Sequence, residues 1–501
     1  MGSVAAVLNS RSSGILLPVF SLPSNYGIGE LGPAALRWLD FLHSCGQKIW
    51  QILPLNPAGF ANSPYQSSSS MAGNSLLIGL EGLLEDGLLE KSDFDGFPPG
   101  GGNRVDYDRI TKPRNILLRR AAGRFLADGG TRDYEIFCAQ EKPWLDDHAL
   151  FCALSQRFAT ADWISWPSEF RDRRESALIS AEKDLVEEIA TERVLQYFFQ
   201  RQWSALRRRA SQLSISIVGD MPIFLSHSSV DLWKNRELFH LDGNGNPMAV
   251  AGVPPDYFSA TGQRWGNPLY RWDKHRETSY AWWICRMARA ISQFDALRVD
   301  HFRAFADYWE IPASEPTAVH GRWVDGPGED FFRALEDKLG PLPIIAEDLG
   351  ILSEKAIALR DRLALPGLRI FLFALDDYHG GSPFLPENFI ENCVAYTGTH
   401  DNATAFESLF GPGEESSKRL ALLKKILPPK YSGAHPIDGA IAWLASSRAR
   451  WVIFPMQDLL HLGSEARMNK PATVVGNWSW RLDNGQMESL DRQFLLSIAK
   501  R

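Results

Sequence analysis

The chain has 501 residues, of which 45% are hydrophobic and 23% charged, as is ordinary for a globular protein. Its formal net charge of −7 argues against a nucleic-acid partner. No apolar run approaches the roughly 18 residues of a membrane helix, so we expect no membrane association. The N-terminus lacks a signal-peptide pattern, which predicts a cytoplasmic protein, or a plastid one if a transit peptide has been removed.

Five cysteines are scattered through the chain without a CxxC pair. They are Cys45, Cys138, Cys152, Cys285 and Cys393. Their odd number and wide spacing predict reduced thiols, with neither a disulfide framework nor a zinc site. We expect no cofactor and no bound metal, and nothing in the sequence indicates an oligomeric state.

Eight short segments predict buried strands, because aliphatic and β-branched residues dominate them. In chain order they are Gly14–Phe20, Lys48–Leu53, Ser214–Asp220, Asp295–Asp300, Pro343–Asp348, Gly367–Phe373, Cys393–Thr399 and Arg450–Phe454. Helical patterns fall between several of them, which predicts parallel βα units. The number of strands favours an α/β fold of the (β/α)8 TIM-barrel type over an open sheet.

Two long stretches interrupt the expected alternation of strand and helix. Residues 60–212 predict a mainly helical subdomain inserted between the second and third strands. Residues 226–280, rich in Trp, Tyr, Gly and Pro, predict a second insertion that carries a loop at 254–265. Because barrel enzymes differ mainly in such insertions, we expect one catalytic barrel over 1–501 with both subdomains at its C-terminal rim.

Carboxylates stand at the C-terminal ends of four predicted strands, where the active site of a barrel enzyme lies. They are Asp220, Asp300, Glu347 and Asp401. An ionised and a protonated carboxyl form the working pair of glycoside cleavage. Glu347 ends an apolar run, and burial would raise its pKa as a general acid requires.

The neighbours of these acids leave alternatives open. Arg298 and Asp300 share a strand face, so the guanidinium either activates a nucleophile or forms a structural ion pair. Adjacent Glu347 and Asp348 point to opposite sides, and we expect Asp348 to cap the following turn. His400 beside Asp401 could ligate a metal, but without a second histidine nearby a structural or substrate-binding role is favoured.

Nine segments, spread from Leu53 to Trp478, carry a family resemblance. They are Leu53–Pro57, Ser63–Gln66, Gly252–Ser259, Thr261–Pro268, Leu297–Arg303, Ala346–Gly350, Gly398–Asn402, Gly463–Asn469 and Gly476–Trp478. With them the chain resembles the 4-α-glucanotransferases, known as amylomaltases or disproportionating enzymes, of glycoside hydrolase family 77 in the α-amylase clan. The acid motifs indicate only the clan, whereas the run from Pro254 to Pro268 selects the family.

The resemblance implies a role for each matching residue. Asp300 would be the nucleophile, Glu347 the acid/base and Asp401 the stabiliser of the distorted sugar. The residues expected to hold the sugar at the cleaved bond are Tyr65, Asp220, Arg298 and His400. The expected acceptor-side contacts are Ser63, Asp256, Gln263 and Asn469. Phe258 and Trp265 are expected to stack on the glucan from a covering loop, although either ring could instead belong to the core.

The expected reaction is retaining transfer of α-1,4-glucan segments through a covalent glucosyl ester. The partners would be maltooligosaccharides, starch or glycogen, as both donor and acceptor. Two alternatives remain: an α-amylase-like hydrolase and a non-catalytic glucan-binding barrel. Phe60 occupies a position where some family members carry Tyr at a secondary glucan site, which leaves that accessory site in question.

Overall fold

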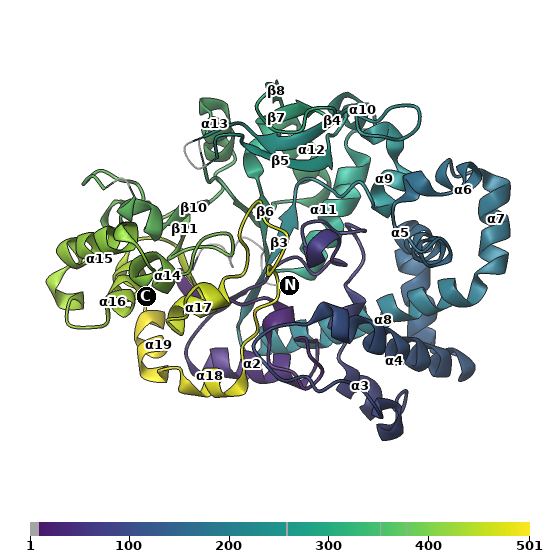
Figure 1. The fold of residues 1–501 in the computed structure, drawn as a ribbon, viewed down its shortest axis with the longest axis horizontal. Helices are drawn as coiled ribbons and strands as arrows, with labels where there is room; N and C mark the ends of the chain where they lie inside the picture. The colour runs from purple at the N-terminus through teal and green to yellow at the C-terminus, as the bar shows by residue number, and fades with distance from the viewer. Residues whose placement is uncertain (1–9, 257–258, 351, 377) are drawn as a thin grey trace.

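The computed structural model describes residues 10–256, 259–350, 352–376 and 378–501. At its centre, eight parallel strands close into a barrel in the order β1-β12-β11-β10-β9-β6-β3-β2. These strands are β1 Ser12–Leu16, β2 Ile49–Gln51, β3 Ser216–Pro222, β6 Ala296–Asp300, β9 Ile344–Ala346, β10 Gly367–Ile370, β11 Cys393–Tyr396 and β12 Trp451–Pro455. Each predicted strand overlaps one of them, so the predicted TIM barrel is confirmed (Figure 1).

Helices follow most of the barrel strands along the chain. They are α2 Pro33–Ser44, α3 Leu80–Glu85, α4 Tyr107–Ala127, α5 Arg132–Arg157, α6 Ser168–Arg171, α7 Glu175–Asp184, α8 Val186–Gln212, α9 Val230–Lys234, α10 Trp272–Glu277, α11 Ala281–Gln293, α12 Glu329–Leu339, α13 Glu354–Arg362, α14 Ala405–Phe410, α15 Glu414–Ile426, α16 Pro436–Ser446, α17 Met456–Leu459, α18 Asn484–Ser489 and α19 Arg492–Ala499. In the described residues, β10 and β11 are joined by 3-10 turns instead of an α-helix.

The helices α3 to α8 lie between β2 and β3, where the first insertion was expected. They gather on one side of the barrel, away from α14–α16 on the other side (Figure 1). The long helix α8 packs against α5 and α4 and also against α2 and β3. It therefore ties this helical group to the barrel, and the boundary of the insertion stays a prediction. No helix in the described part of the chain is long and apolar enough to cross a membrane.

A second sheet stands beside the barrel, in the order β5-β4-β7-β8. It consists of β4 Ala249–Val253, β5 Gln263–Pro268, β7 Asp307–Pro312 and β8 Arg322–Asp325, and its pairs are antiparallel. The sequence predicted none of these four strands, and two of them, β7 and β8, follow β6 and not β3. The segment 226–280 thus completes its sheet with residues from the next βα unit, which brings β5 close to the end of β6.

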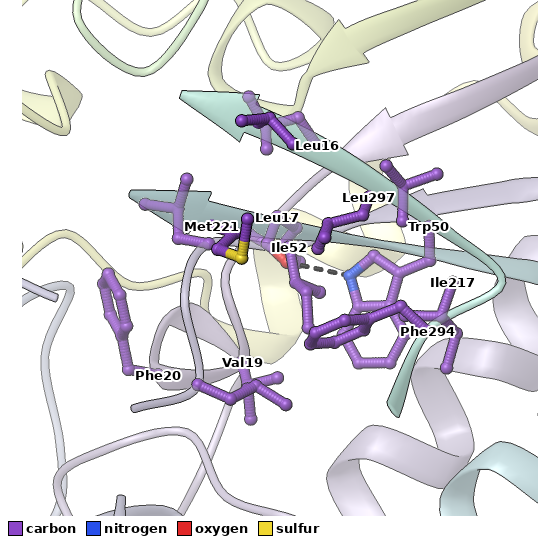
Figure 2. Packing of buried hydrophobic residues seen from close by; sticks show 14 of the residues in the cluster. Leu16, Leu17, Val19, Phe20, Trp50, Ile52, Ile217, Met221, Phe294 and Leu297 are labelled. Atoms are coloured by element: carbon purple, nitrogen blue, oxygen red, sulfur yellow. Dashed lines mark hydrogen bonds between the residues drawn. The ribbon is translucent and has the colours of Figure 1, made fainter. Parts of the chain in front are cut away.

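Apolar side chains from β1, β2, β3 and β6 fill the space beneath the rim (Figure 2). Trp50 is fully buried there, and its indole Nε1 donates to the carbonyl oxygen of Leu17 at 2.8 Å. A Cβ atom at Gly219 would lie 2.3 Å from the ring of Phe294, so only glycine lets that ring pack against β3. This close packing fixes the strands that carry the polar groups of the rim.

Candidate active site

Neighbouring strands β3 and β6 bring three charged residues together at the rim. In the register of the pair, Asp220 lies opposite Arg298, and Asp300 is the last residue of β6. Arg298 Nη1 lies 2.8 Å from both oxygens of Asp220, and Arg298 Nη2 lies 3.0 Å from Asp300 Oδ1. Arg298 is buried, whereas 28% of the Asp300 side chain is exposed. The guanidinium thus holds one carboxylate in the core and presents the other to solvent.

Asp300 sits in an environment with opposing effects on its charge. Burial raises the pKa of Asp300 to about 6, although the nearby Arg298 guanidinium acts to lower it. The charges of Asp220 and Asp401 add to the rise. At neutral pH the carboxyl is therefore mainly ionised, as a nucleophile must be.

Glu347 follows β9 directly and accepts hydrogen bonds from two backbone N–H groups. His301 N donates to Glu347 Oε2 at 2.7 Å, and Leu349 N donates to Glu347 Oε1 at 2.9 Å. His301 reaches that position in a left-handed conformation with φ 52°. Burial, together with the charge of Asp300, raises the pKa of Glu347 to about 7, against the opposing effect of Arg298. Glu347 thus keeps a proton at a pH where Asp300 has lost its own.

Asp348, next to Glu347 in the chain, binds α13 and β10. Its carboxylate pairs with Arg360 of α13 and accepts a hydrogen bond from Leu368 N of β10 at 2.6 Å. These contacts tie the end of β9 to the helix layer and to β10, and a cap on the turn at Gly350 stays a prediction. The two adjacent acids do point to opposite sides, as predicted.

Asp401 lies in the loop after β11, between a histidine and an amide. Its Oδ2 is 3.2 Å from His400 Nε2, and its Oδ1 accepts from Asn469 Nδ2 at 2.6 Å. Although burial acts to raise it, these two neighbours lower the pKa of Asp401. Asp401 thus stays ionised beside a carboxyl pair of higher pKa, as a group that stabilises positive charge on a sugar must.

Tyr65 links the loop after β2 to the same cluster. Its hydroxyl donates to Asp220 Oδ2 at 2.7 Å and lies 2.9 Å from His400 Nε2. The rings of Tyr65 and His400 stack with centroids 5.3 Å apart, and Trp478 packs 5.5 Å from Tyr65. Trp478 was not assigned a role from the sequence, although its Gly476–Trp478 segment belongs to the motifs that carry the resemblance.

The sheet beside the barrel places Trp265 over the end of β6. Its ring meets the His301 ring edge-on with centroids 4.7 Å apart, and its Nε1 donates to Gln263 Oε1 at 3.1 Å. Trp265 is half-buried in this position. For His301, directly after Asp300, the sequence left the same alternatives open as for His400. Its backbone N–H donates to Glu347, and its ring packs against Trp265.

The remaining predicted contacts lie in loops. Ser63 Oγ accepts from Tyr65 N at 3.2 Å and so shapes the turn that carries the tyrosine. Asp256 is exposed in the 254–265 loop, and its Oδ1 accepts from Ser259 N at 2.8 Å. Phe258 lies outside the described residues. Phe60 is 74% exposed.

Two carboxyls with separated pKa values and a third ionised carboxylate, at the C-terminal rim of a TIM barrel, define a class of enzymes that cleave glycosidic bonds. In the described residues, the groups of side chains that could hold a metal lie elsewhere, at His148, Cys152 and Glu192 and at His435, Asp438 and His461.

Comparisons with known proteins narrow this class. A family model described as 4-alpha-glucanotransferase matches residues 17–487. The 4-alpha-glucanotransferase of Thermus thermophilus is 44% identical over 95% of this chain and 96% of its own length. The chloroplastic/amyloplastic 4-alpha-glucanotransferase of Solanum tuberosum is 41% identical over 96% of this chain and 84% of its own length. A solved structure of the Streptococcus agalactiae amylomaltase in complex with acarbose superposes with a TM-score of 0.93, at 39% identity over 98% of this chain and 99% of that chain.

The chain therefore belongs to the 4-alpha-glucanotransferase family, glycoside hydrolase family 77. Its activity is that of a 4-alpha-glucanotransferase, which confirms the enzyme class expected from the motifs.

Proposed function

We propose that the enzyme transfers α-1,4-glucan segments with retention of configuration, through a glucosyl ester on Asp300. Asp300 attacks the anomeric carbon while Glu347 protonates the leaving glucan oxygen. The ionised Glu347 then removes the proton from the 4-hydroxyl of an acceptor glucan, which attacks the ester and regenerates both carboxyls. Asp401 stabilises the positive charge that develops on the sugar in both steps.

The observation that carries this proposal is the difference between the two rim carboxyls. Asp300 faces the Arg298 guanidinium at 3.0 Å, whereas Glu347 accepts hydrogen bonds from the backbone N–H groups of His301 and Leu349. One acid is thus poised to attack and the other to give a proton, as the retaining mechanism requires.

The same groups suggest how the sugars are held. The polar cluster of Tyr65, Asp220, Arg298 and His400 offers donors and acceptors for the hydroxyls of the sugar at the cleaved bond. We expect Ser63, Asp256, Gln263 and Asn469 to contact the acceptor, and Trp265 and Phe258 to stack on the glucan. A covered acceptor site disfavours water in the second step, which favours transfer over hydrolysis.

We expect maltooligosaccharides, starch and glycogen as donors and acceptors. The cytoplasm stays the predicted compartment, and the plastid name of the Solanum tuberosum relative supports a plastid stroma as the alternative.

Incubation with maltotriose tests the proposal. Transfer gives glucose together with a ladder of longer maltooligosaccharides, and Asp300→Asn should abolish both. Glucose and maltose without longer products would instead identify a hydrolase. Binding of starch that is unchanged in Asp300→Asn, with no activity in either protein, would identify a non-catalytic glucan binder.

A further inference from the structure

A second constellation of ionisable side chains lies far from the rim, between the two longest helices of the described chain. His148 and Cys152 stand four residues apart on α5 and so share one helix face, and Glu192 faces them from α8. His148 Nε2 lies 3.2 Å from Glu192 Oε1 and 3.7 Å from Cys152 Sγ. The ligand atoms of the three residues all lie within 4.8 Å of one another.

These distances match the edges of a metal coordination polyhedron. With zinc bonds of about 2.0–2.1 Å to nitrogen and oxygen and about 2.3 Å to sulfur, a tetrahedron separates its ligand atoms by roughly 3.3–3.6 Å. The nitrogen-to-oxygen distance of 3.2 Å and the nitrogen-to-sulfur distance of 3.7 Å both lie within about 0.1 Å of that range. Small side-chain movements would therefore bring the three atoms around one ion.

The chemistry of the three ligands also suits a divalent metal of the zinc type. Thiolate, imidazole and carboxylate are the donors that zinc uses in proteins. A thiolate and a carboxylate together balance the two charges of the ion. His148 is 1% exposed, whereas Cys152 and Glu192 are only partly buried, which leaves an approach for the ion from solvent.

A supporting layer holds the carboxylate in place. Gln196 Nε2 donates to Glu192 Oε1 at 2.9 Å, one helical turn along α8. The Gln196 amide also forms two hydrogen bonds with the backbone of Gly73. Its Oε1 accepts from Gly73 N at 2.8 Å, and its Nε2 donates to Gly73 O at 3.0 Å. Hydrogen bonds of this kind orient the ligands of natural metal sites.

The other possible metal-binding group lacks this geometry. His435 and His461 lie with their rings stacked, centroids 4.3 Å apart and planes 24° from parallel. Because the lone pairs of imidazole lie in the ring plane, two nearly parallel rings cannot both aim at one ion. His435 Nδ1 also accepts a hydrogen bond from Ile437 N at 3.4 Å. This group serves better as an internal control than as a site.

We infer that His148, Cys152 and Glu192 form a binding site for one zinc-type divalent cation that fastens α5 to α8. Binding replaces the thiol proton of Cys152, and any second proton on His148, by the metal ion, and these protons pass to solvent. The sequence predicted no bound metal. The spacing of His148 and Cys152 alone specifies no metal site, and the third ligand, Glu192, comes from another helix. The site lies outside the rim, so its existence does not depend on the proposed glucan chemistry.

Titration of the chelator-treated, full-length protein with Co²⁺ tests the site. We expect a thiolate-to-cobalt charge-transfer band and tetrahedral ligand-field bands that saturate at about one ion per chain. Cys152→Ser should abolish the charge-transfer band and weaken Co²⁺ binding at least about tenfold. Cys285→Ser, which changes an exposed cysteine elsewhere, and His461→Ala should leave the band unchanged.

The inference is overturned if the wild-type protein shows no charge-transfer band, or if the band persists in Cys152→Ser. Circular dichroism and the maltotriose reaction check that Cys152→Ser is folded. If that variant fails to fold, X-ray absorption at the zinc edge of the wild-type protein decides whether the three residues bind the metal. One sulfur at about 2.3 Å with nitrogen and oxygen at about 2.0–2.2 Å supports the site, and a shell without sulfur refutes it.

Discussion

At the scale of single residues, the surroundings of Asp300 and Glu347 set their protonation. Burial raises both pKa values, to about 6 for Asp300 and about 7 for Glu347. Arg298 forms an ion pair with Asp300, whereas Glu347 is held by the backbone of His301 and Leu349. Between these values Asp300 has lost its proton and Glu347 still carries one, which is the state that can cleave a glycosidic bond.

We expect a bell-shaped dependence of kcat/KM on pH. Activity should fall below about pH 6 because Asp300 takes up a proton, and above about pH 7 because Glu347 loses one. Outside these limits the fall should be about tenfold per pH unit. Initial rates of glucose release from maltotriose between pH 4 and 9 measure it. The two apparent pKa values of this profile belong to the interacting pair of acids and not to one residue each.

Glu347→Gln provides the control for this profile. With a glucosyl fluoride donor, whose leaving group needs no proton, the first step should still proceed in this variant. The burst of fluoride release should then lose the alkaline fall and keep the acid one. An alkaline fall that persists in Glu347→Gln would show that another group is the acid.

At the scale of elements, the sheet β5-β4-β7-β8 holds Trp265 against the turn after β6. An aromatic contact contributes about 0.5–1.5 kcal/mol. We therefore expect Trp265→Ala to raise the acceptor KM about two- to tenfold and to increase the share of hydrolysis. The ratio of transferred to hydrolysed product, measured with glucose as the acceptor, tests this.

Trp323→Ala is the matched control, because this tryptophan lies on β8 of the same sheet and is 44% exposed. It should leave the product ratio near that of the wild type. Equal effects of both substitutions would mean that damage to the sheet, and not a lost glucan contact, explains the result.

Local patterns could predict the barrel strands but not the second sheet. β6 is apolar except for Arg298 and its final carboxylate, and β11 is apolar throughout, so each stands out in the sequence without its neighbours. β7 pairs with β4, which lies far away in the chain, and β8 pairs with β7, so both depend on that distant segment. The same limit applies at the rim, where Tyr65 meets Asp220 and His400 across 155 and 335 positions. The motifs predicted which residues matter, but not these contacts.

At the scale of the whole molecule, a buried ion pair joins the helical insertion to the barrel. Arg114 of α4 lies 3.0 Å from Glu30 in the loop after β1, and its second nitrogen donates to Ile78 O at 2.6 Å. Arg114→Met would leave the Glu30 carboxylate buried without its charged partner, with the backbone of Leu80 still beside it. We expect a loss of about 3–5 kcal/mol in the free energy of unfolding, measured by urea denaturation.

The pH dependence of this loss has a defined sign. Burial raises the pKa of Glu30 in the folded protein, so the cost is present at neutral pH and vanishes as the pH falls below the unfolded value of about 4.3. The variant should therefore be closer to the wild type at pH 4 than at pH 7. Adding Glu30→Gln should restore part of the stability, and Lys418→Met, which breaks an exposed pair, should change little. A pH-independent loss would argue against an unpaired carboxylate as its cause.

Trapping the glucosyl ester tests the role of Asp300 as the nucleophile most directly. Glu347→Gln, given a maltosyl fluoride donor, should form the ester and then stall, because the base for the second step is missing. Mass spectrometry of the digested protein should find the sugar on the peptide that contains Asp300. Stoichiometric fluoride release without an adduct, or an adduct on another residue, would contradict the assignment of Asp300 as the nucleophile.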